Sequence, residues 1–254
     1  MKNEYWGLNP LKVAGVSFEL GYGYSKFVSL KINNKKFIPV LWAWPNIFSI
    51  ALEDKTKEKV FAKVEEMADN LNFYGYARDV RILDHHVMIG YPSIKFGKGP
   101  WAPENSSEIG KAEKYKKMNI LTKWKAHFKR GFANFTYDIW MTKSNKGKPK
   151  KDDLEVMVWL DYDHTPPYER IGETKDFIIA IAPPKKFSHH RIDFYLKNKS
   201  RMAKFDLKEL IKICKKSIKS LDSYYIRSIE LGTEFTKNTE VETKLFKLEF
   251  DFKK

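Results

Sequence analysis

The chain has 254 residues, of which 43% are hydrophobic and 15% aromatic, enough for one large β domain or two small ones. No apolar run approaches the ~20 residues that span a bilayer, and the first ten residues lack the apolar segment of a signal peptide, so we expect no membrane partner and a cytoplasmic protein, or a secreted one if a leader was removed. The formal net charge of +15 is spread through nearly every segment, which argues against a specific nucleic-acid partner.

Most of the chain alternates short β-forming segments with turn residues. The segments are rich in β-branched and aromatic residues and are separated by Gly, Pro, Asn and Asp, which is typical of an all-β sandwich or barrel. Residues 56–69 are ambiguous between helix and strand. No internal repeat or low-complexity linker occurs, so we predict a single domain over residues 1–254. Strands are predicted at residues 27–33, 36–41, 72–76, 86–96, 132–142, 154–162, 176–182, 190–196, 225–231 and 243–252.

One segment predicts a helix, at residues 206–221. Asp206 with Glu209 three residues later forms a capping-box signal. We expect this helix to pack against the outside of a sheet, with the only cysteine as a small core residue, so an internal disulfide is excluded. The apolar residues at helical spacing are Leu207, Leu210, Ile211, Cys214, Ile218 and Leu221.

A hairpin is predicted from residues 134–142 and 154–161, joined by a loop without large apolar residues. If the loop is centred near residues 146 and 147, Asp138 lies opposite Glu155, and cross-strand neighbours have Cβ atoms about 4.5–5.5 Å apart. The opposite face of residues 154–161 is uniformly apolar and must belong to the core. The face that carries the acids holds Asp138, Trp140, Glu155, Met157 and Trp159.

Carboxylates among aromatic side chains describe a sugar-binding groove, because aromatic rings stack on pyranose rings and carboxylates address hydroxyls and the glycosidic bond. Two neighbouring acids do not both ionise cheaply. A protonated Asp138 could therefore donate a hydrogen bond to an ionised Glu155. The alternative is a solvated sheet edge that carries ordinary acids.

A second acidic strand is predicted at residues 226–234. Glu230 and Glu234 share a face if the strand stays regular through Gly232, which predicts a bulge or a close backbone approach to a ligand. Two carboxyl groups from separate strands fit glycoside hydrolysis, in which one acid protonates the leaving oxygen and the other attacks or activates water. Sequence spacing alone leaves either glutamate as the general acid.

Four segments, taken in order, resemble glycoside hydrolase family 12 of prokaryotic or archaeal type. The resemblance covers roughly residues 40–252 and leaves residues 1–40 as an N-terminal extension of unassigned role. It implies an all-β, concanavalin-like β-jelly-roll sandwich of two antiparallel sheets, with an open substrate cleft and one packed helix. The segments are Gly-Tyr-Pro-Ser-Ile-Lys-Phe-Gly-Lys-Gly-Pro-Trp at 90–101, Tyr-Asp-Ile-Trp-Met-Thr at 137–142, Glu-Val-Met-Val-Trp-Leu at 155–160 and Ser-Ile-Glu-Leu-Gly-Thr-Glu at 228–234.

The resemblance also implies a retaining endo-β-1,4-glucanase, a hydrolase of polysaccharides. Glu155 would be the nucleophile, Glu234 the acid/base and Asp138 the helper acid. Glu230 is disfavoured because its position can hold Gln in relatives. The expected partner is a β-glucan, with no cofactor, no metal and a monomeric chain. The side chains predicted to contact substrate are Trp101, Trp159, Phe48, Tyr91 and Met157.

The chain departs from the family near its start, where relatives carry Asn-Asn-x-Trp. Phe48 stands at the fitting spacing in place of the Trp, and Trp42 or Trp44 could supply the sugar platform instead. The pairs at 85–86 and 189–190 are adjacent histidines, which point to opposite faces of a strand and so predict no metal site. Two other functions stay open: a non-catalytic carbohydrate-binding β-sandwich, and a basic β-domain for nucleic acid, against which the acids of the groove argue.

Overall fold

The computed structural model describes residues 16–17, 23–25, 30–32, 35–43, 60–78, 88–100, 107–183, 187–199, 201–218 and 221–254. Within these ranges the chain forms two β-sheets and one α-helix, α2, at Leu207–Cys214. The strands are β1 Val16–Ser17, β2 Gly23–Ser25, β3 Leu30–Ile32, β4 Lys35–Ala43, β5 Val60–Glu66, β6 Leu71–Ala77, β7 Gly90–Gly97, β8 Gly110–Lys111, β9 Lys117–Lys129, β10 Ala133–Thr142, β11 Leu154–Tyr162, β12 Glu169–Glu173, β13 Phe177–Ile181, β14 His190–Leu196, β15 Met202–Asp206, β16 Tyr225–Phe235 and β17 Thr239–Lys253.

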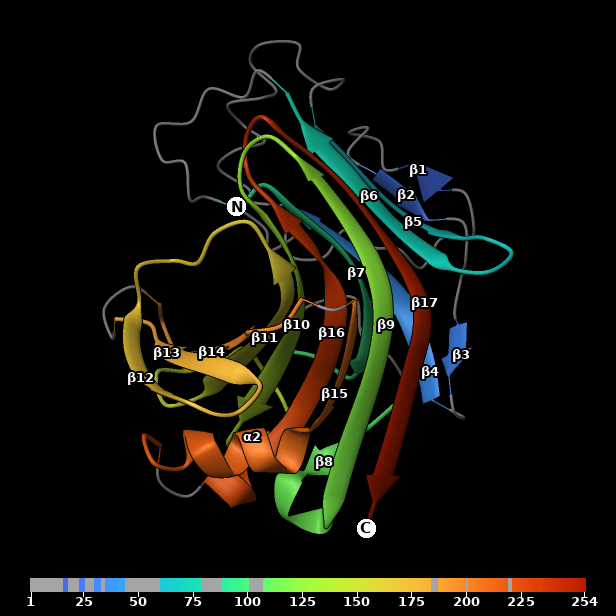
Figure 1. Cartoon of the computed structure of the whole chain (residues 1–254). Helices are drawn as coiled ribbons and strands as arrows, with labels where there is room; N and C mark the ends of the chain where they lie inside the picture. The colour runs from blue at the N-terminus through green and yellow to red at the C-terminus, as the bar shows by residue number, and fades with distance from the viewer. Residues whose placement is uncertain are drawn as a thin grey trace.

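The described strands form two layers, which we name sheet A and sheet B. Sheet A has the order β12-β13-β14-β11-β10-β16-β7-β4-β3, with β8 beside β16, and sheet B has the order β1-β2-β5-β6-β17-β9-β15. Neighbours are antiparallel as predicted, except that β11 runs parallel to β14 and β2 parallel to β5. Figure 1 shows β9 and β17 side by side as the longest curved strands of sheet B. The predicted β-jelly-roll sandwich is confirmed.

The core lies between the sheets and follows from strand alternation. On β11, Val156, Val158 and Leu160 are fully buried in the main apolar cluster, as predicted. The opposite face of β11 belongs to a second, smaller cluster that contains Met157 and Trp159. Sheet A is therefore apolar toward sheet B, and its other face is free to carry polar chemistry.

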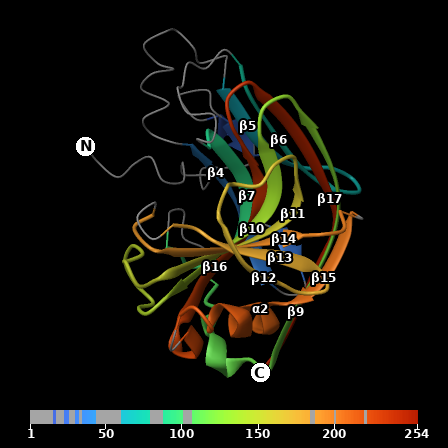
Figure 2. The same cartoon turned by 60° about the vertical axis from the view of Figure 1, so that its left-hand side comes forward.

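The helix α2 begins where the capping signal predicts. The Asp206 side chain accepts a hydrogen bond of 3.0 Å from the backbone N–H of Lys208, whereas Glu209 pairs with Lys212 instead of closing the capping box. The helix ends at Cys214, seven residues earlier than predicted at residue 221, and its cysteine is buried as expected. Figures 1 and 2 both place α2 at one end of the molecule, near the C-terminus.

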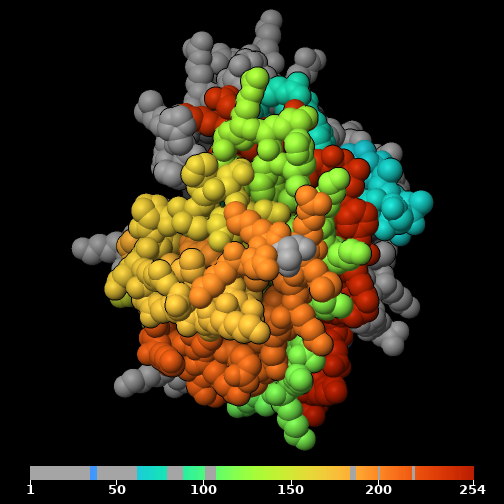
Figure 3. Space-filling model, viewed as in Figure 1, coloured from blue at the N-terminus to red at the C-terminus, as the bar shows by residue number. Residues whose placement is uncertain are grey.

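Six of the described strands were missing from the sequence prediction: the short strands β1, β2 and β8, and the longer strands β9, β12 and β15. The ambiguous residues 56–69 contain a strand, β5. Figure 3 shows side chains of β9, in green, and β17, in red, along the right-hand part of the face seen. Within the described ranges, the chain contains no helix with the length and apolarity that membrane crossing demands.

Candidate active site

Three adjacent strands of sheet A bring the predicted acids together, because β10 pairs with β11 on one side and with β16 on the other. Asp138 lies opposite Met157, and Glu155 lies opposite Trp140, so the predicted pairing of Asp138 with Glu155 is wrong by two residues. A shift of two residues keeps each side chain on its face. Asp138 and Glu155 are thus diagonal neighbours on one face of sheet A, which we name the acidic face.

The strand β16 adds two more carboxyl groups to the acidic face. Asp138 lies opposite Glu230, and Glu234 follows four residues later on the same face, as predicted for a regular strand. The predicted bulge at Gly232 is absent: the register runs through it unbroken. The glycine instead allows β7 to approach closely, because a Cβ there would lie 2.3 Å from the carbonyl oxygen of Pro92.

Glu155 is held by two cationic or hydrogen-bonding neighbours. His189 Nε2 donates to Glu155 Oε2 at 2.9 Å, and a guanidinium nitrogen of Arg191, Nη1, lies 3.8 Å from Glu155 Oε1. Arg191 is the register partner of Glu155 on the parallel strand β14. Burial raises the pKa of Glu155, but the charge of Arg191 and the hydrogen bond from His189 outweigh it, so the pKa lies below the ordinary value of a glutamate.

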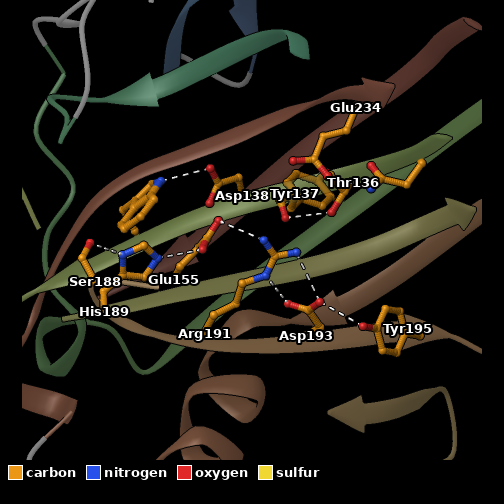
Figure 4. A network of polar contacts seen from close by, with 12 residues as sticks. Thr136, Tyr137, Asp138, Glu155, Ser188, His189, Arg191, Asp193, Tyr195 and Glu234 are labelled. Carbon is orange, nitrogen blue, oxygen red and sulfur yellow. Dashed lines mark hydrogen bonds and ion pairs between the residues drawn. The ribbon is translucent and has the colours of Figure 1, made fainter. Parts of the chain in front are cut away.

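Glu234 has the opposite electrostatic character. Asn134 Nδ2 donates to Glu234 Oε2 at 2.7 Å, and the Glu234 residue is 6% exposed. Burial raises the pKa of Glu234 to about 7, against the lowering effects of Arg191 and Asn134 and with a further increase from the negative charge of Glu155. Near pH 7, Glu155 is therefore ionised, whereas about half of the Glu234 carboxyl groups keep their proton. Figure 4 shows the two side chains together with Asp138.

Asp138 is the most strongly perturbed acid on this face. Burial, followed by the like charges of Glu155, Glu230 and Glu234, raises the pKa of Asp138 well above its usual range, although a hydrogen bond of 3.0 Å from Trp140 Nε1 to Oδ2 opposes the rise. Among the described residues, Asp138 makes no hydrogen bond to Glu155. In the observed register Asp138 lies two residues away from the position opposite Glu155, and His189 donates the hydrogen bond to Glu155 that was expected from Asp138.

The remaining acid, Glu230, is paired with a buried lysine. Lys95 on β7 is fully buried, and its Nζ lies 3.6 Å from Glu230 Oε1. Burial raises the pKa of Glu230, while Lys95 opposes the rise. Glu230 is therefore a member of a buried ion pair on the acidic face, which distinguishes it from Glu234.

The predicted substrate-binding side chains fall into two groups. Trp159 and Met157 have no exposed surface, and Trp159 packs edge-on against Tyr195 with ring centroids 5.2 Å apart. Tyr91 is 1% exposed and donates a hydrogen bond of 3.3 Å to the backbone carbonyl of Thr136. All three lie on the acidic face of sheet A, where they are buried and pack beneath the site instead of exposing a surface on which a sugar could stack. Trp101 and Phe48 lie outside the described residues, as does the alternative platform Trp44.

The sequence-based reasoning missed the residues that surround the acids: Asn134, His189, Arg191 and Asp193. The signal for two of them was present, since β14 alternates Arg191, Asp193 and Tyr195 on one face with three apolar residues on the other. Charged residues at alternate positions of a buried strand indicate a polar site. The histidine precedes β14, and nothing local in the sequence indicates its partner.

Two further features of the described residues concern other kinds of site. No group of three or more His, Cys, Asp or Glu side chains within them is arranged to hold a metal ion. A cavity of about 390 Å³ lies away from the acids, at the start of β16, where Lys98, Glu108, Tyr225 and Arg227 are among its lining residues. We place the chemistry at the acids because their burial and opposed pKa values, rather than the size of a hollow, define a reactive site.

Comparisons with known proteins agree with this arrangement. The family model "Glycosyl hydrolase family 12" matches residues 86–251, more than half of the chain. The fold is similar to that of a family 12 xyloglucanase from Bacillus licheniformis, with a TM-score of 0.67 and 16% identity over 89% of this chain and 97% of that one. An endoglucanase from Rhodothermus marinus gives a TM-score of 0.59 and 17% identity, over 74% and 85% of the two chains.

A third similar structure is the xyloglucanase domain of NopAA from Sinorhizobium fredii, solved with cellobiose, with a TM-score of 0.59 and 12% identity over 89% of this chain and 97% of that domain. No curated protein matches the chain by sequence. At such low identities the structural likeness concerns the fold, whereas the family match covers the strands that carry every acid described above. The chain belongs to glycoside hydrolase family 12 and is a glycoside hydrolase.

Proposed function

We propose that the protein is a retaining endo-glycosidase that hydrolyses β-1,4-glucosidic bonds in glucans. The observation that carries this proposal is the opposed tuning of two carboxyl groups on one face: the pKa of Glu155 is lowered, and that of Glu234 is raised to about 7. Retaining hydrolysis needs one ionised carboxylate as nucleophile and one protonated acid as proton donor. Environments that separate two pKa values in this way assign the two roles.

In the first step, Glu155 attacks the anomeric carbon while the bond from that carbon to the leaving oxygen breaks. Glu234 gives its proton to the leaving oxygen, so the departing sugar leaves as an alcohol and Glu234 becomes a carboxylate. The negative charge of Glu155 disappears in the glycosyl ester. General acid catalysis of this kind contributes about 10²–10⁴-fold.

In the second step, water attacks the anomeric carbon and Glu234 takes its proton, which restores Glu155 as the leaving carboxylate. Formation of the ester at Glu155 makes Glu234 a better general base in this step. The charge of Glu155 is one of the causes that raise the pKa of Glu234, so its loss lowers that pKa and favours the ionised base.

The floor of the site also offers hydrogen-bonding atoms for sugar hydroxyls. Asp138 Oδ1 and Asn134 Oδ1 are buried without a hydrogen-bond partner among the described residues. Buried polar atoms usually have a partner, and substrate hydroxyls can supply one. Asp138, kept protonated by burial and its acidic neighbours, would lie beside the nucleophile without adding a competing charge.

The test is release of reducing sugars from mixed-linkage β-glucan and carboxymethyl cellulose. We expect Glu155→Gln and Glu234→Gln to abolish most turnover, and Glu209→Gln, at an exposed residue of α2, to leave it unchanged. Sugar binding without any release by the unmutated chain would favour the carbohydrate-binding alternative. Turnover that survives both substitutions in the acidic face would refute the assigned roles.

A further inference from the structure

Arg191 is a buried cation shared unequally between two carboxylates. Its Nε and Nη2 atoms donate to the two oxygens of Asp193, at 2.9 and 3.3 Å, whereas Nη1 lies 3.8 Å from Glu155 Oε1. Tyr195 donates to Asp193 Oδ2 at 2.9 Å and so holds the far side of this pair. The Arg191 side chain is 10% exposed, and the Asp193 side chain is fully buried. Figure 4 shows the guanidinium between the two carboxylates.

The two oxygens of Glu155 consequently have different surroundings. Oε2 is fixed by the 2.9 Å hydrogen bond from His189, whose ring packs edge-on against Trp140 with centroids 4.6 Å apart. Oε1 faces Arg191 at a distance too long for a hydrogen bond. No donor among the described residues therefore engages Oε1, although the nearby positive charge still stabilises the carboxylate.

We propose that Asp193 is a positioning residue that holds Arg191 at this distance, so that Glu155 Oε1 is stabilised as an anion yet stays available as the attacking atom. The inference rests on the proposed function, in which Glu155 is the nucleophile. Without Asp193, the fork of Arg191 would be free to close onto Glu155 as a bidentate pair, the strongest arrangement for arginine with a carboxylate.

Charge balance in the covalent step gives Asp193 a second task. When Oε1 forms its bond to the anomeric carbon, the electron pair of the broken bond goes to the leaving oxygen, which receives the proton of Glu234. Glu155 then carries no charge. Arg191 thereby loses the counter-charge of Glu155, whereas Asp193 stays hydrogen-bonded to it and keeps this buried cation paired throughout the step.

The pH dependence of Glu155 follows from all the groups that face it. Burial raises its pKa, and Arg191 and His189 lower it. The charge of Glu155 in turn raises the pKa values of Asp138, Glu230 and Glu234 on the other strands, and Tyr168 and Asp193 flank Arg191. Removing the cation and removing its counter-charge must therefore shift the titration of Glu155 in opposite directions. A purely structural role of the pair would not produce that opposition.

The experiment measures kcat/KM against pH with an aryl β-cellobioside, together with the rate of the glycosylation burst. For Asp193→Asn we expect the acid limb, which reports Glu155 in the free enzyme, to move down by about one pH unit and the burst to slow by about 10²-fold. For Arg191→Met we expect the acid limb to move up by about one unit. The double variant Arg191→Met/Asp193→Asn should recover most of the burst lost in Asp193→Asn.

Controls separate the possible failures. Asp161→Asn removes a carboxylate that accepts from Trp124 outside the acidic face, and it should leave the acid limb in place. If Glu155→Gln is inactive but Asp193→Asn and Arg191→Met shift the limb in the same direction or not at all, the inference is wrong and the proposed function stands. If Glu155→Gln keeps its turnover, both fail. If Asp193→Asn does not fold, the test rests on Arg191→Met alone. An acid limb of Arg191→Met that does not move to higher pH then overturns the inference.

Discussion

The hydrogen bond from Asn134 to Glu234 offers a sharp test of how the acid/base is tuned. In Asn134→Ala, the carboxylate of Glu234 loses the 2.7 Å bond that stabilises its ionised form. A hydrogen bond to a charged group is worth about 1.5–3 kcal/mol, and one pKa unit corresponds to about 1.4 kcal/mol. The protonated acid loses part of the same bond, so a net rise of about one unit in the pKa of Glu234 is expected.

The sign of the kinetic effect follows from the role of the acid. Glu234 must be protonated in the first step, so the rate falls as pH rises through its pKa, which is about 7 in the unmutated protein. A pKa near 8 instead would raise the protonated fraction at pH 8 from about one tenth to about one half. Relative to its own plateau, Asn134→Ala should therefore be about five-fold more active at pH 8.

The assay is the pH profile of kcat/KM on a soluble β-glucan, with Asn119→Ala as the matched control. Asn119 donates to Asp251 on an exposed part of sheet B, remote from the acids. The control should reproduce the unmutated basic limb. A basic limb in Asn134→Ala that stays in place or moves to lower pH would refute the reasoning that this bond holds down the pKa of Glu234.

Three further predictions concern stability. The pKa of Glu234 is about 7 in the folded protein and its ordinary value is 4.5, so stability declines as pH rises from 4.5 to 7. Glu234→Gln should therefore raise the free energy of unfolding by about 3 kcal/mol at pH 8 and leave it unchanged at pH 4, and equal shifts of the melting temperature at the two pH values would count against this reasoning. Lys95→Met should lower the free energy of unfolding, measured in urea, by about 3–5 kcal/mol, and adding Glu230→Gln should restore most of that loss. A double variant that is no more stable than Lys95→Met would contradict the ion pair. Gly232→Ala should cost about 1–3 kcal/mol in the same assay, because its Cβ would collide with the backbone of Pro92, and an unchanged midpoint would show that β7 yields easily.

Local alternation carried much of the prediction. The apolar face of β11 and the shared face of Glu155, Met157 and Trp159 follow from a period of two, and the structure confirms both. Strand β9 was not predicted, because lysines occupy many of its outward positions and make the segment resemble a polar loop, although Met118 and Trp124 are buried in the core. Alternation with charged outer residues still marks a half-buried strand.

Register and long-range pairing could not be read from the sequence. The loop of residues 143–153 is centred one residue later than assumed, at a turn where Gly147 has a φ of +77° and Asp153 accepts from the backbone N–H of Lys143 and Lys150. Loop composition alone does not specify such a turn.

The cationic partner of Glu155 was even harder to predict from the sequence. Arg191 faces it across a parallel pair of strands, and the connection between these strands contains two further strands, β12 and β13. Parallel pairing depends on how distant segments cross over, which no local turn signal reports. The nucleophile was therefore predictable from its own strand, whereas the cation that tunes it required the fold.

The most direct measurement of the central claim is to trap the glycosyl ester with an activated 2-deoxy-2-fluoro-β-cellobioside and to locate the label by mass spectrometry of peptides. If Glu155 is the nucleophile, a single sugar adduct should appear on the peptide that contains it, and inactivation should follow the same time course. An adduct on Glu230 or Glu234, or steady turnover of the reagent with no adduct, would contradict the account.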